Sequence, residues 1–171
     1  SSVGVGAEEY AAVGKGLKDY FSYNILMDPK ETGEVMPGYV DKHVKVVYAD
    51  SPVPAMKAVK TDAEIKGFKA AMLRDGVAMV KFLRWLQPAV EAGGQTEMSV
   101  DRKLTELRAE QKRFRDISFD TIAGYGPHGA IVHYEASPET DVELRPEGFL
   151  LLDSGAQYQD GTTDITRTIP L

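Results

Sequence analysis

The stretch Leu150–Asp164, LLLDSGAQYQDGTTD, carries the strongest indication of how this chain folds. Its leucines predict a buried strand that leads directly to Asp153. Asp160-Gly161 is a typical turn dipeptide of a β-hairpin, and Asp164 follows on the returning strand. The stretch therefore predicts an antiparallel hairpin with a carboxylate on each of its strands.

The two carboxylates are expected on the same face of this hairpin. When the turn has two or four residues, the numbers of facing residues add to an odd value, as 153 and 164 do. A turn centred on Asp160-Gly161 leaves Asp153 and Asp164 offset by four residues. A bulge at Gly155 or after Gly161 would bring them level. The pattern thus predicts the face and leaves the register open.

Carboxylates that share a face beside a buried strand repel each other, and solvation, protonation of one group or a cation between them relieves this. Oxygen ligands suit manganese or magnesium, and imidazole extends the range to cobalt and zinc. The alternative is that Asp160 is only a turn residue and that Asp153 and Asp164 are solvated strand ends. Two carboxylates are too few for a tight metal site, so the spacing leaves both interpretations open.

Short apolar runs alternate with glycine and proline from residue 117 onward, which is typical of strands and turns. We expect strands over residues 117–124, 129–135, 147–154 and 162–169. His133 falls inside the second run. A strand histidine is usually exposed or hydrogen-bonded, and its functional interpretation is a donor or acceptor near a substrate.

The sequence supports neither a dinucleotide-binding motif nor a serine nucleophile. Gly124–Gly129 matches the G-x-G-x-x-G pattern of dinucleotide sites, but it opens no predicted helix and Pro127 interrupts it, so we interpret it as a tight turn. No G-x-S-x-G elbow surrounds Ser154, and no serine–histidine–aspartate triad is evident.

Two amphipathic helices are predicted before these strands. Thr61-Asp62-Ala63-Glu64 is a capping box that starts a long helix, ended by Pro88 and Gly93-Gly94. Its apolar stripe is Ile65, Phe68, Met72, Met79, Leu83 and Leu86. A second helix from about Ser99 has the apolar residues Val100, Leu104 and Leu107. We interpret its charged residues as a solvated face: Arg102, Lys103, Glu106, Arg108 and Glu110.

The first fifty residues predict a separate unit. A helix is expected over residues 7–20, and strands are expected over residues 23–27 and 43–48. Ser51-Pro52 is a helix-start signal, so the boundary between the two units is predicted between residues 50 and 60.

Composition narrows the class of protein. The chain has 171 residues, enough for one domain or one domain plus part of another. A net charge of −6 argues against a general nucleic-acid binder, and no apolar run is long enough to cross a membrane. The chain lacks cysteine and a signal segment, which favours a cytoplasmic protein. It begins at Ser1 and stops inside a predicted strand at Leu171, so we expect a fragment.

Residues 152–168, LDSGAQYQDGTTDITRT, closely resemble the first metal-ligand segment of the larger type of Xaa-Pro aminopeptidase (aminopeptidase P). Gly129–Tyr134, GAIVHY, resembles the strand that precedes this segment in the family. Ser118-Phe119, Pro127 and residues 51–60, SPVPAMKAVK, also fit. The resemblance covers about residues 51–171.

The resemblance implies a pita-bread α/β fold, in which two pseudo-symmetric halves carry long amphipathic helices on a curved, mostly antiparallel sheet. Residues 51–171 would supply the first half of this catalytic domain. Residues 1–50 would be the C-terminal part of a preceding creatinase-like α/β domain.

The resemblance also implies roles for three residues. Asp153 would bind one of two divalent metal ions, usually manganese, and Asp164 would bridge both. His133 would contact the substrate and steady the tetrahedral intermediate. The implied reaction removes the N-terminal residue of peptides with proline in second position, by attack of a metal-bridging hydroxide. A homodimer is implied for the complete protein.

The family completes this site with a histidine and two glutamates from the second half, which the sequence does not contain. We therefore expect a complete protein that is a dinuclear metallopeptidase and an isolated chain that is inactive. Two alternatives remain open: a prolidase of the same fold that cleaves Xaa-Pro dipeptides, and a non-enzymatic binding module that keeps the fold.

Overall fold

The computed structural model describes residues 24–40 and 42–171. The chain divides into two compact units between Val59 and Lys60, and each is described by itself. The helix expected over residues 7–20 lies outside the described residues. The identities assigned to the two predicted domains stay predictions.

The first unit holds a small parallel strand pair. Strand β1 (Ile25–Met27) pairs with β2 (Val46–Tyr48). The unit also contains the 3-10 turn η1 (Met36–Tyr39) and the short helix α2 (Val53–Ala58). The buried Asp28 carboxylate accepts hydrogen bonds from the backbone amides of Ser51 at 2.7 Å and Lys30 at 2.9 Å, which lower its pKa.

The second unit begins with the two predicted helices, α3 (Asp62–Glu91) and α4 (Glu97–Ala109). The predicted capping box of α3 is confirmed, because the Glu64 amide donates to Thr61 Oγ1 at 3.2 Å and the Thr61 amide donates to Glu64 Oε2 at 2.7 Å. The expectation that Pro88 ends α3 is wrong. Pro88 lies in the last turn, where its missing amide removes one helical hydrogen bond. Gly93, with φ of 82°, follows the helix end.

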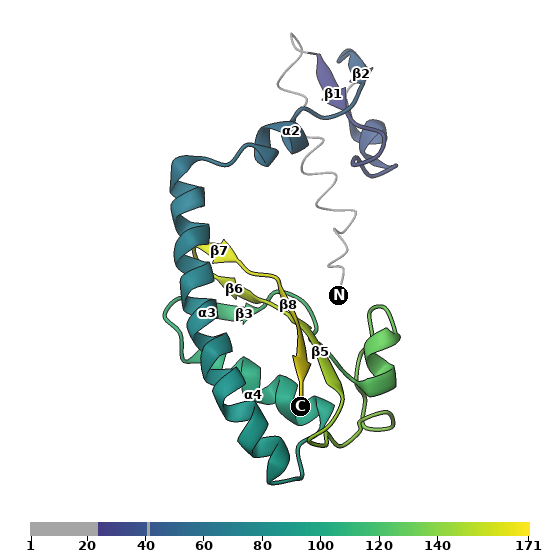
Figure 1. The fold of residues 1–171 in the computed structure, drawn as a ribbon. Helices are drawn as coiled ribbons and strands as arrows, with labels where there is room; N and C mark the ends of the chain where they lie inside the picture. Colours follow the sequence, from purple (N-terminus) through teal and green to yellow (C-terminus); the bar gives the residue numbers. More distant parts are fainter. Residues whose placement is uncertain (1–23, 41) are drawn as a thin grey trace. The chain divides into compact units, whose positions relative to one another are not determined.

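Two three-stranded antiparallel sheets complete this unit (Figure 1). One contains β3 (Phe114–Ile117), β6 (Ala156–Tyr158) and β7 (Gly161–Thr162) in the order β3-β6-β7. The other contains β4 (Ile122–Tyr125), β5 (Phe149–Ser154) and β8 (Ile165–Pro170) in the order β4-β5-β8. The predicted α/β class with long helices on antiparallel strands is confirmed.

The strand expected over residues 129–135 is wrong. The 3-10 turn η2 (Gly126–Ala130) occupies its start, and His133 has a φ of 55° that is incompatible with an extended strand. The cause is a close backbone contact. A Cβ on Gly124 would lie 2.8 Å from the Gly129 amide nitrogen, so the segment folds back against β4.

The hairpin predicted around Asp160 is present, with a different turn. Tyr158 pairs with Gly161, so the turn consists of Gln159-Asp160, one residue earlier than expected. Ser154 pairs with Ile165, and no bulge interrupts the pairing of β5 with β8. The residues facing each other still have numbers that add to an odd value.

Helices α3 and α4 cover one face of the β4–β5–β8 sheet. The core contains Met79, Phe82, Leu86, Val90, Val100, Leu104, Leu107, Ala123, Leu150, Leu152 and Ile165. The predicted stripe of α3 is partly wrong, because Ile65, Met72 and Leu83 are exposed. Small residues occupy the buried face where α3 meets the β6–β7 turn. A Cβ on Gly161 would lie 3.0 Å from Cβ of Ala71.

Arg108 contradicts the prediction of a solvated charged face on α4. Its side chain is completely buried and forms an ion pair with the equally buried Asp75 of α3. Helical periodicity placed Arg108 among charged neighbours, but its partner lies 33 residues away in the sequence. No helix in the described part of the chain is both long and apolar enough to cross a lipid bilayer.

Candidate metal site

Asp153 lies on the face of the β4–β5–β8 sheet opposite the helices, and Asp164 immediately precedes β8. Along β5, Leu150, Leu152 and Ser154 are buried, so Asp153 alternates onto the other face. It pairs with Thr166, whose hydroxyl donates to Asp153 Oδ1 at 2.8 Å.

Asp164 is exposed and stands two residues before Thr166. It therefore falls on the same face as Asp153, one step further along the hairpin. Neither carboxylate forms an ion pair with another residue that the structure describes. This face thus holds two carboxylates whose charges no described cation neutralises.

His133 shares a cavity with Asp153. The cavity has a volume of about 290 Å³, and its walls include His133, Val132, Leu151, Asp153 and Thr166. The structure therefore brings two of the three residues proposed from the sequence to one cavity. Asp164 does not line it.

Glu97, which the sequence analysis missed, holds the segment that leads to His133. Its completely buried carboxylate accepts from the Tyr125 amide at 2.7 Å and the Tyr134 hydroxyl at 2.7 Å, and lies 2.9 Å from His128 Nδ1. Burial raises the pKa of Tyr134 above its usual value, a hydrogen bond with Thr140 opposes this, and the Glu97 carboxylate adds to the rise, so the hydroxyl stays a donor. An acid directly after the capping Thr96 was the available signal.

The donor set fits a hard divalent ion, but it is incomplete. Asp153 and Asp164 supply oxygen ligands of the kind that Mn²⁺ and Mg²⁺ prefer. Among residues 24–40 and 42–171, no three His, Cys, Asp or Glu side chains form a group that could hold a metal ion. The described residues can therefore provide only part of a metal site.

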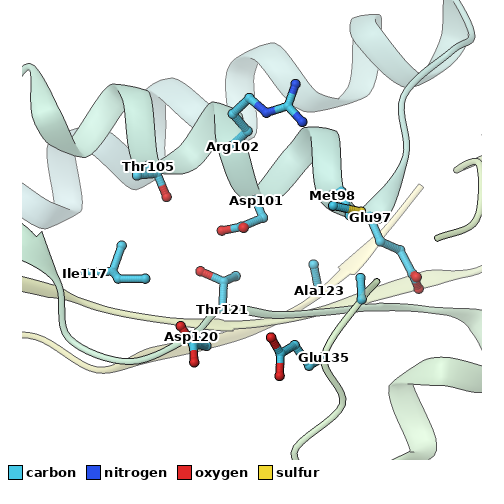
Figure 2. Close-up of a pocket in the computed structure, with 11 residues that line it drawn as sticks. Glu97, Met98, Asp101, Arg102, Thr105, Ile117, Asp120, Thr121, Ala123 and Glu135 are labelled. Carbon is cyan, nitrogen blue, oxygen red and sulfur yellow. The ribbon is translucent and has the colours of Figure 1, made fainter. Parts of the chain in front are cut away.

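A second cavity, with a volume of about 360 Å³, lies between α4 and the segment that joins β3 to β4 (Figure 2). Figure 2 shows Asp101 projecting from α4 toward Thr121, with Asp120 and Glu135 on the opposite wall. None of the residues proposed from the sequence lines this cavity. We therefore place the candidate site on the opposite face of the sheet, at Asp153 and Asp164.

Comparison with known sequences identifies relatives of the second unit. A model of metallopeptidase family M24 matches residues 66–171. The chain is 49% identical over 124 residues to aminopeptidase P2 of Arabidopsis thaliana, an alignment that covers 72% of this chain and 18% of the relative. It is 42% identical over 120 residues to the Xaa-Pro aminopeptidase ApepP of Drosophila melanogaster, covering 70% and 20%. The chain spans about a fifth of the length of these relatives.

Comparison with solved structures gives the same fold. X-prolyl aminopeptidase of Caenorhabditis elegans, described as a cytosolic enzyme with a di-nuclear active site, is 32% identical with a TM-score of 0.80. The match covers 94% of this chain and 27% of that one. Xaa-Pro dipeptidase of Bacillus anthracis is 24% identical with a TM-score of 0.78, covering 99% and 45%, and supports the fold alone.

These matches confirm the resemblance found in residues 152–168 and the expected pita-bread architecture. The family model matches residues 66–171, a range that contains Asp153, Asp164 and His133. The chain belongs to metallopeptidase family M24.

Proposed function

We propose that this chain contributes two aspartate ligands and a substrate contact to the dinuclear metal site of an Xaa-Pro aminopeptidase. The observation that carries the proposal is the placement of Asp153 and Asp164 on one face of the β5–β8 pair, with His133 beside Asp153 in one cavity. The names of the Arabidopsis and Drosophila relatives support the substrate class.

Each residue has one role in this proposal. Asp153 and Asp164 would hold the divalent ions, and His133 would contact the substrate beside them. When bound, divalent ions of this kind lower the pKa of water and polarise a carbonyl group. The chain's own contribution would be to provide two carboxylates for the ions and one imidazole for the substrate.

We infer that the remaining ligands are the histidine and two glutamates that the family resemblance implies. Asp153 and Asp164 supply about two negative charges against about four positive charges on two divalent ions. We therefore infer that the isolated 171-residue chain is inactive and binds metal weakly. A high-affinity dinuclear site measured in this chain alone would contradict the inference.

The metal, the cellular location and the oligomeric state are part of the same proposal. We infer that the metal is manganese and that the protein lies in the cytoplasm. The description of the C. elegans relative as a cytosolic enzyme with a di-nuclear site supports the location and the number of ions. A homodimeric complete protein rests on the family resemblance alone.

The test uses the complete protein and a Xaa-Pro-Yaa tripeptide. Release of the N-terminal residue is followed with and without Mn²⁺, beside an Asp164→Asn variant. We expect metal-dependent cleavage that the variant loses. Cleavage of Xaa-Pro dipeptides in preference to tripeptides would instead identify a prolidase. If the protein cleaves neither substrate with any divalent metal, the non-enzymatic binding module is the correct interpretation.

A further inference from the structure

A completely buried ionic cluster lies behind the candidate metal site, on the helix side of the hairpin. Its centre is Asp75 of α3, whose carboxylate accepts four hydrogen bonds. Arg108 of α4 donates two of them, from Nε to Oδ1 at 2.8 Å and from Nη2 to Oδ2 at 3.1 Å. The hydroxyl of Tyr158 donates to Oδ1 at 3.1 Å, and that of Thr163 donates to Oδ2 at 3.0 Å. All four side chains are at most 1% exposed.

Stability alone does not account for this cluster. A buried ion pair loses its hydration, and apolar residues of similar volume often stabilise a fold as well or better. Unlike an apolar group, a carboxylate that accepts four hydrogen bonds fixes the orientation of the groups that donate them. Here Oδ2 of Asp75 fixes the orientation of the Thr163 hydroxyl, and Thr163 immediately precedes Asp164.

Every polar group of Thr163 is held. Its hydroxyl accepts from the Ala156 amide at 2.9 Å while it donates to Asp75. Its amide donates to the Ala156 carbonyl at 2.9 Å. Its carbonyl accepts from Ser118 Oγ at 2.9 Å. Because both peptide groups and the side chain are bonded, Thr163 has one available position.

Gly155 allows the same close packing from the opposite strand. A Cβ at this position would lie 2.0 Å from the Thr163 carbonyl oxygen, so only glycine lets the strands approach this closely. Thr163 is therefore held by Asp75 of α3 on one side and by the Ser118 hydroxyl and the closely packed Gly155 backbone on the other. The position of the next Cα, that of Asp164, follows from this arrangement.

We propose that Thr163 is a positioning residue, held by the Asp75–Arg108 pair, that places the Asp164 carboxylate for metal binding. The inference rests on the proposed role of Asp164 as a ligand. It assigns to a buried ion pair on two helices a function at the opposite face of the sheet. Residues that orient metal ligands typically change metal affinity by about 10- to 100-fold when they are removed.

The test measures Mn²⁺ affinity in the complete protein by titrating free Mn²⁺ with electron paramagnetic resonance. Thr163→Val removes the hydroxyl and keeps the volume. Thr163→Ser restores the hydroxyl. Tyr158→Phe is the matched control, because it removes another buried hydroxyl from the same carboxylate without touching Thr163.

We expect Thr163→Val to weaken Mn²⁺ binding by about tenfold or more. Thr163→Ser and Tyr158→Phe should stay within about threefold of the wild type. Equal affinity of Thr163→Val and wild type would overturn the proposal, as would an equal loss in Tyr158→Phe, which would indicate general destabilisation. A wild-type protein that binds no divalent metal would refute the proposed function instead, so the two failures are distinguishable.

A second variant keeps the test decisive if Thr163→Val does not fold. Ser118→Ala removes only the hydrogen bond to the Thr163 carbonyl, from a partly buried position. We expect it to weaken Mn²⁺ binding by about two- to fivefold, since one of several bonds is lost. Unchanged affinity in a folded Ser118→Ala protein would count against the positioning role.

Discussion

Replacing Arg108 by methionine tests the buried ion pair directly. Methionine fills a similar volume but leaves the Asp75 carboxylate buried without its cation, in contact only with the hydroxyls of Tyr158 and Thr163. Removing one partner of a buried pair costs about 3–5 kcal/mol. Two of the four hydrogen bonds to Asp75 disappear with the guanidinium. We therefore expect a loss of about 3 kcal/mol or more in local stability.

The assay is hydrogen exchange in the complete protein, followed by mass spectrometry on peptides from α3 and from β6 to β8. A loss of about 3 kcal/mol corresponds to exchange that is about a hundredfold faster. Arg102→Met is the matched control, because Arg102 lies on the same helix and is exposed. If exchange in Arg108→Met stays within about threefold of the control, the reasoning is refuted. An unpaired, desolvated carboxylate should destabilise the fold by far more than such a small change in exchange rate indicates.

Three further outcomes follow from contacts around the candidate site. Gly155→Ala should destabilise the hairpin by about 1–3 kcal/mol, measured by the same exchange experiment, because its Cβ would overlap the Thr163 carbonyl. Burial by itself would raise the pKa of Asp160, but Arg74 and Arg113 together lower it, so Asp160→Asn should weaken the β6–β7 turn at pH 7. The wild-type advantage should disappear as the pH falls through that lowered pKa, below the usual aspartate range, in exchange profiles recorded against pH. Glu97→Gln should speed exchange in residues 126–134 by about tenfold and raise KM, because Glu97 holds this segment through Tyr125 and Tyr134. The Mn²⁺ affinity should stay unchanged, because Glu97 contacts neither aspartate.

Local rules predicted much of the fold. The capping box at Thr61 identified the start of α3, because capping depends on residues three apart in the sequence. The period of two along a strand placed Asp153 and Asp164 on one face, and this survived the one-residue error in the turn. Parity is preserved whenever a register changes by two, so the prediction did not need the correct turn.

The errors arise where distant residues decide the structure. The GAIVHY segment has the composition of a strand, yet Gly124 and Glu97 hold it as a turn against the sheet. Arg108 has charged neighbours in sequence, yet its partner Asp75 lies on another helix. Asp75 does not stand out in a single sequence, and the position of Glu97 after the capping Thr96 does not reveal its partners, because the role of each carboxylate appears only when three or four donors converge on it.

The position of Asp164 in the fold explains why such a costly cluster lies behind it. Both strands of the hairpin change sheets at the same level: β5 gives way to β6 at Gly155, and β7 gives way to β8 at Thr163 and Asp164. At this crossing neither strand continues the regular ladder of a single sheet, so backbone pairing alone holds a carboxylate there less rigidly. Side-chain bonds from Asp75 and Ser118 take the place of the missing neighbours. Under the proposed role of Asp164, its carboxylate would point away from both sheets at this crossing, and the bonds from Asp75 and Ser118 to Thr163 would hold the residue that precedes it.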